Sequence, residues 1–252
     1  MKMTAISGGT LQMRRSVYFE DAAPGELITL PVSCFLIQHP QGNVLFDTGC
    51  HPELVTDPVS RIGGMAKMMR VISEASVNVV QALEHMGITL GDIDVVVNSH
   101  LHPDHCGCNG FFGSATQICH RCELEAARQE EAERAGYFKA DWAGGPPFTE
   151  IDGEYDVFGD GRIVLIPLPG HTPGSIGALV TLDRDGPFLL ASDAASMREN
   201  LDQGTIPRNT WDKGQFMGSI KEMRRYQNMG FNVIYGHDYR QWVKIEQKKY
   251  FA

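Results

Sequence analysis

The stretch that most constrains this chain is Asn98–Gly107, which places three histidines and one aspartate within six residues. These potential ligands are His100, His102, Asp104 and His105. The stretch follows the apolar run Ile93–Val97, whose length and composition predict a buried strand that ends in a tight turn. Neutral imidazole and carboxylate suit Zn²⁺, and a catalytic zinc keeps one coordination position open for water. A histidine-rich surface loop or a structural histidine would explain a single residue, but this cluster behind one strand favours a metal site.

Three later apolar segments also lead into a potential ligand. They are Ile163–Leu168 with His171 close behind, Pro187–Ser192 with Asp193, and Phe231–Gly236 with His237. Each segment is predicted to be a buried strand, and strands that end along one sheet edge bring these side chains into a common cleft. The complete set has five imidazoles and two carboxylates. Because one catalytic zinc needs three protein ligands, this set fits two ions that share one carboxylate.

The composition fits one enzyme domain over residues 1–252. The chain is 42% hydrophobic, enough for one substantial core, and contains no linker or low-complexity tract. A formal charge of −9 argues against nucleic acid as a partner, because nucleic-acid binding depends on clustered lysine and arginine. No apolar run could span a bilayer, and Met1–Gly9 lacks the apolar core of a secretory signal. We therefore expect a cytoplasmic protein without membrane contact.

The cysteines do not follow a disulfide pattern. Six cysteines in a chain of this size do not form a disulfide framework. Cys119 and Cys122 make one C-x-x-C pair, but a zinc ribbon needs a second such pair and none is present. The spacing alone leaves a redox dithiol open. We expect ordinary thiols in or near a helix.

Two aspartates outside the ligand set are candidates for orienting ligand histidines. Val44–Phe46 predicts a strand that ends at Asp47, which either caps a loop or holds a ligand ring in place, as metal sites require. Asp238, directly after His237, is a second candidate for the same role.

A methionine-rich segment lies within residues 51–90, which are predicted to be largely helical. Met65, Met68 and Met69, followed by Ile72, recur at helical spacing. This spacing favours a core face or a homodimer face, and an adaptable apolar lip over a substrate is the alternative. Farther along the chain, residues 123–135 predict a charged helix whose Glu and Arg side chains make a solvated face.

The motifs, taken in order, resemble those of the metallo-β-lactamase superfamily. They are Val44-Leu45-Phe46-Asp47-Thr48-Gly49, His100-Leu101-His102-Pro103-Asp104-His105, Pro169-Gly170-His171-Thr172-Pro173-Gly174, Ser192-Asp193-Ala194 and Gly236-His237-Asp238. The resemblance covers the chain from roughly Leu30 to His237. It implies an α/β fold (α+β in some schemes), namely an αββα sandwich with a dinuclear zinc site at one edge of its two sheets.

The resemblance also implies how the ligands are divided between two Zn²⁺ ions per chain. The first ion would be held by His100, His102 and His171. The second ion would be held by Asp104, His105 and His237. Asp193 would bridge the two ions.

Within the superfamily, the chain is most similar to the N-acyl-homoserine lactonases and to 4-pyridoxolactonase, which Ile118–Arg121 especially resembles. This similarity implies hydrolysis of a small lactone or activated ester, and a role in quorum quenching. A metal-bridging hydroxide would attack the carbonyl carbon, the first zinc would polarise its oxygen, and Asp104 would pass a proton to the leaving oxygen. One position departs from the pattern. Both lactonase groups carry tyrosine three residues after the bridging aspartate, where this chain has Ser196, and Tyr137 is the nearest expected replacement.

Other functions stay open for the same residues. Dinuclear zinc also hydrolyses thioesters and phosphotriesters, so either class could supply the substrate. A mononuclear iron oxidoreductase would use part of the ligand set, although His102 stands where flavodiiron proteins carry glutamate, which favours hydrolysis. A degenerate superfamily member would only bind a partner or ligand, and the presence of the complete ligand set argues against that.

Overall fold

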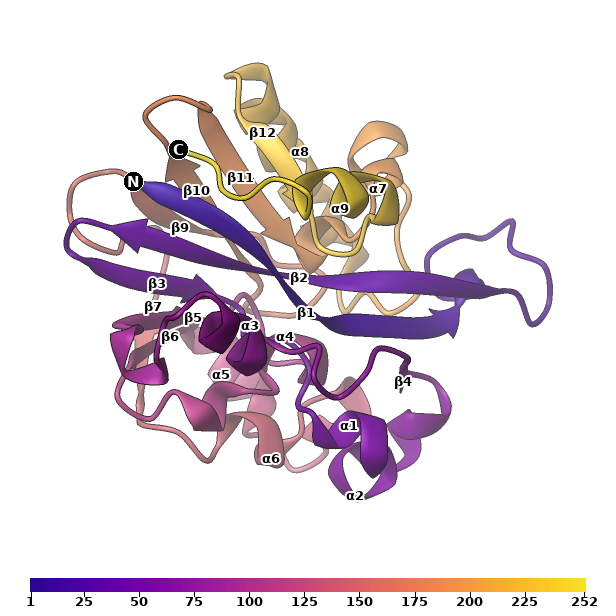
Figure 1. The fold of residues 1–252 in the computed structure, drawn as a ribbon. Coiled ribbons are helices and arrows are strands. Elements are labelled where there is room, and N and C mark those ends of the chain that lie inside the picture. The colour runs from indigo at the N-terminus through magenta and orange to yellow at the C-terminus, as the bar shows by residue number, and fades with distance from the viewer.

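The computed structural model describes residues 1–252, in which two β-sheets pack face to face and helices cover their outer faces (Figure 1). The larger sheet has seven strands in the order β4-β1-β2-β3-β5-β6-β7. The smaller sheet has five strands in the order β12-β11-β10-β9-β8. The predicted αββα sandwich is confirmed.

All strands of the larger sheet come before those of the smaller sheet along the chain. The larger sheet contains β1 (Lys2–Arg14), β2 (Leu27–His39), β3 (Gly42–Phe46), β4 (Arg70–Val71), β5 (Val95–Val97), β6 (Thr116–His120) and β7 (Phe148–Ile151). The smaller sheet contains β8 (Tyr155–Asp156), β9 (Ile163–Pro167), β10 (Ile176–Thr181), β11 (Pro187–Ser192) and β12 (Asn232–Tyr235). Neighbouring strands from β3 to β7 in the larger sheet run parallel, as do β11 and β12 in the smaller one.

Most helices are short. They are α1 (Glu53–Thr56), α2 (Pro58–Ile62), α3 (Val79–His85), α4 (Pro103–Cys106), α5 (Arg121–Ala127), α6 (Lys139–Trp142), α7 (Arg198–Gln203), α8 (Lys213–Asn228) and α9 (Tyr239–Ile245). None of them combines the length and the apolar character needed to cross a membrane.

Apolar side chains fill three layers of the sandwich. Between the sheets, Phe35 of β2 belongs to the same buried cluster as Leu165 of β9. Outside the larger sheet, Leu83 of α3 packs into a second cluster, and outside the smaller sheet α8 contributes Phe216 and Ile220 to a third. Because both faces of β2 are covered, most of its sequence is a continuous buried run instead of an alternating pattern.

Two segments that were predicted to be helical are more divided than expected. Residues 51–90 contain α1, α2 and α3, but a 3₁₀ turn over Gly63–Lys67 and the short strand β4 interrupt them. Adjacent glycines at the start of that turn explain the break, since glycine is among the poorest helix formers. The helix predicted over residues 123–135 is α5, which ends at Ala127, followed by a 3₁₀ turn over Ala132–Ala135.

β1 and the turn after β3 approach each other at two glycines. A Cβ atom on Gly8 would lie 2.7 Å from the Cα atom of Gly49, and Cys50 N donates a hydrogen bond to Gly8 O over 2.8 Å. Gly49 has a φ of 71°, in the left-handed region that favours glycine. This contact holds the turn that carries Asp47 against β1.

Gly8→Ala is expected to lower the free energy of unfolding by about 1–3 kcal/mol, because the added methyl group overpacks a backbone contact. In a chain of this size, each kcal/mol corresponds to roughly 2–4 °C in Tm. Gly113→Ala is the matched control, since nothing lies within 4 Å of the added Cβ atom there. Thermal unfolding compares the two variants, and equal Tm values would contradict a tight contact at Gly8.

Candidate metal centre

The seven predicted ligands converge at one edge of the sandwich. His100, His102, Asp104 and His105 come from the turn after β5 and from α4, at the edge of the larger sheet. The remaining three follow β9, β11 and β12 of the smaller sheet. All of these side chains are buried except that of His102, which is partly exposed. Strand ends that are distant in sequence therefore meet in one place.

The first group of ligands consists of three imidazoles. The ligand atoms of His100, His102 and His171 all lie within 4.8 Å of one another. His171 Nε2 lies 3.1 Å from His102 Nδ1, and the ring centroid of His100 lies 4.7 Å and 4.9 Å from those of His102 and His171. Rings this close repel one another when protonated, but as neutral rings they offer three lone pairs to one cation.

The second group contains a carboxylate and two imidazoles. Asp104 Oδ2 lies 3.4 Å from His105 Nε2 and 3.5 Å from His237 Nε2. Asp193 stands between the two groups, with its Oδ1 3.0 Å from His237 Nε2 and its Oδ2 3.5 Å from His171 Nε2. One carboxylate thus faces both groups, which is the arrangement expected of a ligand shared by two ions.

Hydrogen bonds fix the outer nitrogen of four of the rings. These contacts join His100 Nδ1 to Ser99 Oγ (3.0 Å), His102 Nε2 to Ala135 O (3.0 Å), His105 Nδ1 to Asp47 Oδ2 (2.8 Å) and His237 Nδ1 to Pro31 O (2.8 Å). Carbonyl and carboxylate oxygens only accept hydrogen bonds, so the ring nitrogen that contacts one of them carries the proton. In the neutral ring the other nitrogen then carries a lone pair, which points into the cluster. The inward atoms His100 Nε2 and His105 Nε2 are buried without a hydrogen-bond partner. Because such orphaned atoms are costly, the cluster fits divalent metal bound between these side chains.

Burial and charge set the protonation of the cluster. Burial lowers the pKa of His171 to about 3 and that of His100 well below its usual range, so both rings are neutral near pH 7. Burial raises the pKa of Asp104, but the neighbouring His105 and His237 outweigh it and lower that pKa to about 2. Neutral imidazole and ionised carboxylate are the forms that bind metal.

Of the two roles expected for Asp47, the structure shows the one that orients a candidate ligand. Its Oδ2 accepts a hydrogen bond from His105 Nδ1 at 2.8 Å, and its carboxylate accepts the backbone N–H and the hydroxyl of Ser99, both at 2.7 Å. Asp47 and Ser192, with φ values of 62° and 46°, are the non-glycine residues with positive φ. Strained backbone of this kind persists where surrounding contacts hold it, and both residues adjoin the cluster. Asp238 instead caps α9, where it accepts a backbone N–H at 2.8 Å.

Glu123 was predicted to lie on a solvated helix face, and that prediction is wrong. Its side chain is fully buried, and its carboxylate accepts hydrogen bonds from the backbone N–H groups of Leu101 and Gly174, each at 3.0 Å. These bonds tie the turn after β5 to the loop after β9, and both segments carry ligands of the first group. No local pattern could have shown this role, because both partners are backbone groups in distant segments.

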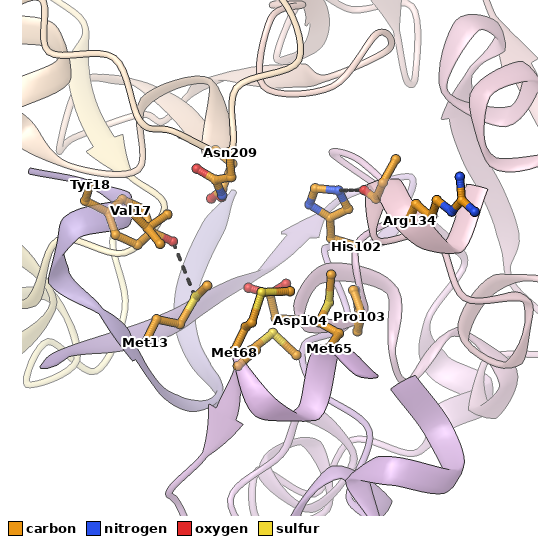
Figure 2. A pocket seen from close by; sticks show the side chains of 13 residues that line it. Met13, Val17, Tyr18, Met65, Met68, His102, Pro103, Asp104, Arg134 and Asn209 are labelled. Atoms are coloured by element: carbon orange, nitrogen blue, oxygen red, sulfur yellow. Dashed lines mark hydrogen bonds between the residues drawn. The ribbon is translucent and has the colours of Figure 1, made fainter. Parts of the chain in front are cut away.

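An apolar cavity of about 310 Å³ opens beside the cluster (Figure 2). Met65, Met68 and Met69 line it together with Asp104 and Asp193. The methionine-rich segment therefore faces the metal-ligand cluster, which supports its interpretation as an adaptable apolar lip.

A second cavity, of about 410 Å³, lies on the other side of His102. His102, Ala135 and Asn209 line both cavities and so form the wall between them. Tyr137 lines this second cavity, and its ring centroid lies 5.5 Å from that of His102. Ser196 is buried and lines neither cavity.

Asp47→Asn is expected to weaken the affinity for Zn²⁺ by about 10–100-fold, because the His105 ring loses its charged acceptor. Asp160→Asn is the matched control, since Asp160 pairs with His39 at 2.9 Å and neither belongs to the cluster. Competition against a chromophoric chelator measures both affinities. Equal Zn²⁺ binding by the two variants would contradict the role assigned to Asp47.

Zinc binding is expected to release protons near pH 7. Burial lowers the pKa values of His105 and His237, but nearby carboxylates outweigh it and raise both above the usual value. At His105 these carboxylates are Asp104 and Asp47. At His237 the main one is Asp193. Ligation requires the neutral ring, so these protons leave as the ion binds, and the affinity falls as the pH is lowered. Calorimetric Zn²⁺ titrations in two buffers of different ionisation enthalpy detect the release. Identical heats in both buffers would show that no protons leave.

Comparison with known proteins agrees with this geometry. The model of the metallo-beta-lactamase superfamily matches residues 27–229. The N-acyl homoserine lactonase AttM of Agrobacterium fabrum is 30% identical over 258 residues, covering 100% of this chain and 98% of that protein. The N-acyl homoserine lactonase AiiA of Bacillus thuringiensis subsp. kurstaki is 29% identical over 251 residues, covering 98% of this chain and 95% of that protein.

A solved structure extends the comparison to three dimensions. It shows an N-acyl homoserine lactone hydrolase with the product N-hexanoyl-L-homoserine bound at its catalytic metal centre. The two chains superpose with a TM-score of 0.89 at 27% identity, covering 99% of this chain and 98% of the other. Since the family model matches most of the chain and the ligand motifs lie together at one sheet edge, this protein belongs to the metallo-β-lactamase superfamily.

Proposed function

We propose that this protein is a dinuclear zinc hydrolase that opens a lactone, either an N-acyl-homoserine lactone or a related small cyclic ester. The observation that carries the proposal is the convergence of seven metal-ligand side chains beside an apolar cavity. The relatives named as N-acyl homoserine lactonases support the same reaction, because they align with this chain over nearly its whole length.

In this proposal the two ligand groups each hold one Zn²⁺. The first group is His100, His102 and His171, and the second is Asp104, His105 and His237, with Asp193 shared between them. Imidazole nitrogen and carboxylate oxygen are ligands that zinc commonly takes. When bound, the ions supply Lewis acidity and lower the pKa of water to about 7, so that hydroxide is available at neutral pH.

The walls of the first cavity suit the two parts of an acylated lactone. The lactone ring would lie at the polar end, beside Asp104 and Asp193. The acyl chain would lie against Met65 and Met68, whose flexible side chains adapt to varied shapes. Met68 is 62% exposed, so a long chain could continue toward solvent past it. Asp104 borders the ring position and would take up a proton and pass it to the leaving oxygen.

The arrangement of the seven candidate ligands favours a dinuclear hydrolase over a mononuclear iron oxidoreductase that would use only some of them. All seven side chains face inward in two adjoining groups, and Asp193 reaches toward both. A site for a single ion would leave one of these groups as buried, unpaired donors, which is costly.

Cellular location and assembly are further parts of the proposal. All six cysteines are free thiols, which supports a reducing compartment such as the cytoplasm. A homodimer through the methionine-rich segment stays a prediction, and Ile72 beside that segment is 42% exposed. The molar mass in solution would test it.

Zinc-loaded protein is expected to open N-hexanoyl-L-homoserine lactone faster than it hydrolyses a thioester or a phosphotriester of similar size. All three reactions release an acid, so a pH indicator in weak buffer follows each of them. Removal of the metal with a chelator should abolish turnover, and added Zn²⁺ should restore it, because no serine or cysteine nucleophile is proposed.

The outcomes of this comparison separate the candidate functions. Faster turnover of the thioester or the phosphotriester would assign the same metal site to that class. Oxygen uptake by a preparation with one iron per chain would indicate an oxidoreductase. A zinc-loaded protein that opens no lactone in a panel of acyl and ring sizes would contradict the proposed function.

A further inference from the structure

Tyr18 is held at the wall of the first cavity by the connection between β1 and β2. A 3₁₀ turn over Arg15–Val17 precedes it, and the N–H of Tyr18 donates to Arg15 O at 3.0 Å. The N–H of Arg208 donates to Val17 O at 2.7 Å, which fastens this turn to the segment before α8. The Tyr18 side chain is therefore placed by backbone contacts on both sides, and only 4% of the residue is exposed.

The hydroxyl of Tyr18 has no strong hydrogen-bond partner in the protein. Its single hydrogen bond in the protein is with the thioether sulfur of Met13 at 3.8 Å, drawn as a dashed line in Figure 2. Thioether sulfur is a weak acceptor, whereas a buried tyrosine hydroxyl usually finds a full partner. A stronger acceptor inside the cavity could replace this contact at little cost.

The first cavity brings Tyr18 together with two carboxylates of the cluster. Tyr18 lines the same cavity as Asp104 and Asp193. Burial raises the pKa of Tyr18 well above its usual value, and the charges of Asp193 and Asp104 raise it further. Near neutral pH the phenol is therefore a protonated donor, and it lines the cavity that the cluster also borders.

Tyr137 differs in this respect. Burial also raises its pKa, but the next cause is Glu123, the buried carboxylate that ties two ligand loops together. The Tyr137 hydroxyl is buried without a hydrogen-bond partner, but the residue lines the second cavity and not the one that Asp104 and Asp193 border. Of the two buried tyrosines near the cluster, Tyr18 is therefore the one that lines the cavity beside Asp104 and Asp193.

We propose that Tyr18 is a catalytic residue of the proposed lactone hydrolysis, in which its hydroxyl donates a hydrogen bond to the carbonyl oxygen of the substrate. The inference rests on the function proposed above and adds a residue to it. The phenol keeps its proton throughout, so no bond forms or breaks at Tyr18. As the carbonyl oxygen gains negative charge, the hydrogen bond strengthens, and a donor already placed in a water-poor cavity needs little rearrangement to make it.

The direct test is Tyr18→Phe, which removes only the hydroxyl, assayed as zinc-loaded enzyme with N-hexanoyl-L-homoserine lactone. We expect kcat to fall by about 100-fold, the size reported for loss of one donor to a developing oxyanion, with KM changed much less. Because the hydroxyl hydrogen-bonds only to a thioether, Tm and zinc content should match those of the parent. Tyr226→Phe is the control, since Tyr226 is a buried residue of α8 that lines neither cavity.

A binding measurement gives a readout that is independent of turnover. Calorimetric titration with the ring-opened product N-hexanoyl-L-homoserine should show about tenfold weaker binding to Tyr18→Phe, because one hydrogen bond to a charged or polar oxygen is lost. Tyr226→Phe should bind the product like the parent.

Each outcome decides the inference. Unchanged kcat and unchanged product binding in Tyr18→Phe would overturn it. A fall in kcat that is matched by lost zinc or a lowered Tm would also overturn it, because Tyr18 would then be structural. A parent enzyme that opens no lactone would remove the proposed function together with this inference, whereas an active parent with an equally active variant removes the inference alone.

Discussion

The structure depends on one electrostatic constraint, which is that seven ionisable side chains meet where little water reaches them. Imidazoles and carboxylates packed this closely would destabilise the fold if their inner atoms stayed unpaired. Hydrogen bonds to the outer nitrogens settle the orientation of the rings, so that lone pairs from two groups point to the space beside Asp193. Cations bound there would satisfy these lone pairs together, and the remainder of the fold brings the donors to that place.

Both sheets are needed to assemble that space. The turn after β5 and α4 together supply four donors, and the segments that follow β9, β11 and β12 of the smaller sheet each supply one more. Two buried carboxylates connect these sources: Glu123 joins the turn after β5 to the loop after β9, and Asp47 holds the His105 ring. Beside this edge, the first cavity is lined by less regular segments, namely the connection after β1 and the methionine-rich turn. The candidate metal ligands and the wall of the cavity therefore come from different parts of the chain.

The convergence of the candidate ligands could be predicted from sequence because each one stands close behind an apolar run that becomes a buried strand. Asp47 could be predicted for the same reason. Glu123 could not, since its partners are backbone groups of Leu101 and Gly174 that only the fold brings near. Tyr18 carries no local pattern either, because its importance comes from the cavity it faces. α8 is different, because its buried residues recur at helical spacing and this pattern is visible in the sequence.

The central claim is that the seven side chains hold two cations on either side of one shared carboxylate. Crystals of the zinc-loaded protein, with anomalous scattering recorded at the zinc absorption edge, test this most directly. We expect two peaks, one beside His100, His102 and His171 and one beside Asp104, His105 and His237, with Asp193 in contact with both. A single peak, or a second ion that lies away from Asp193, would contradict the claim.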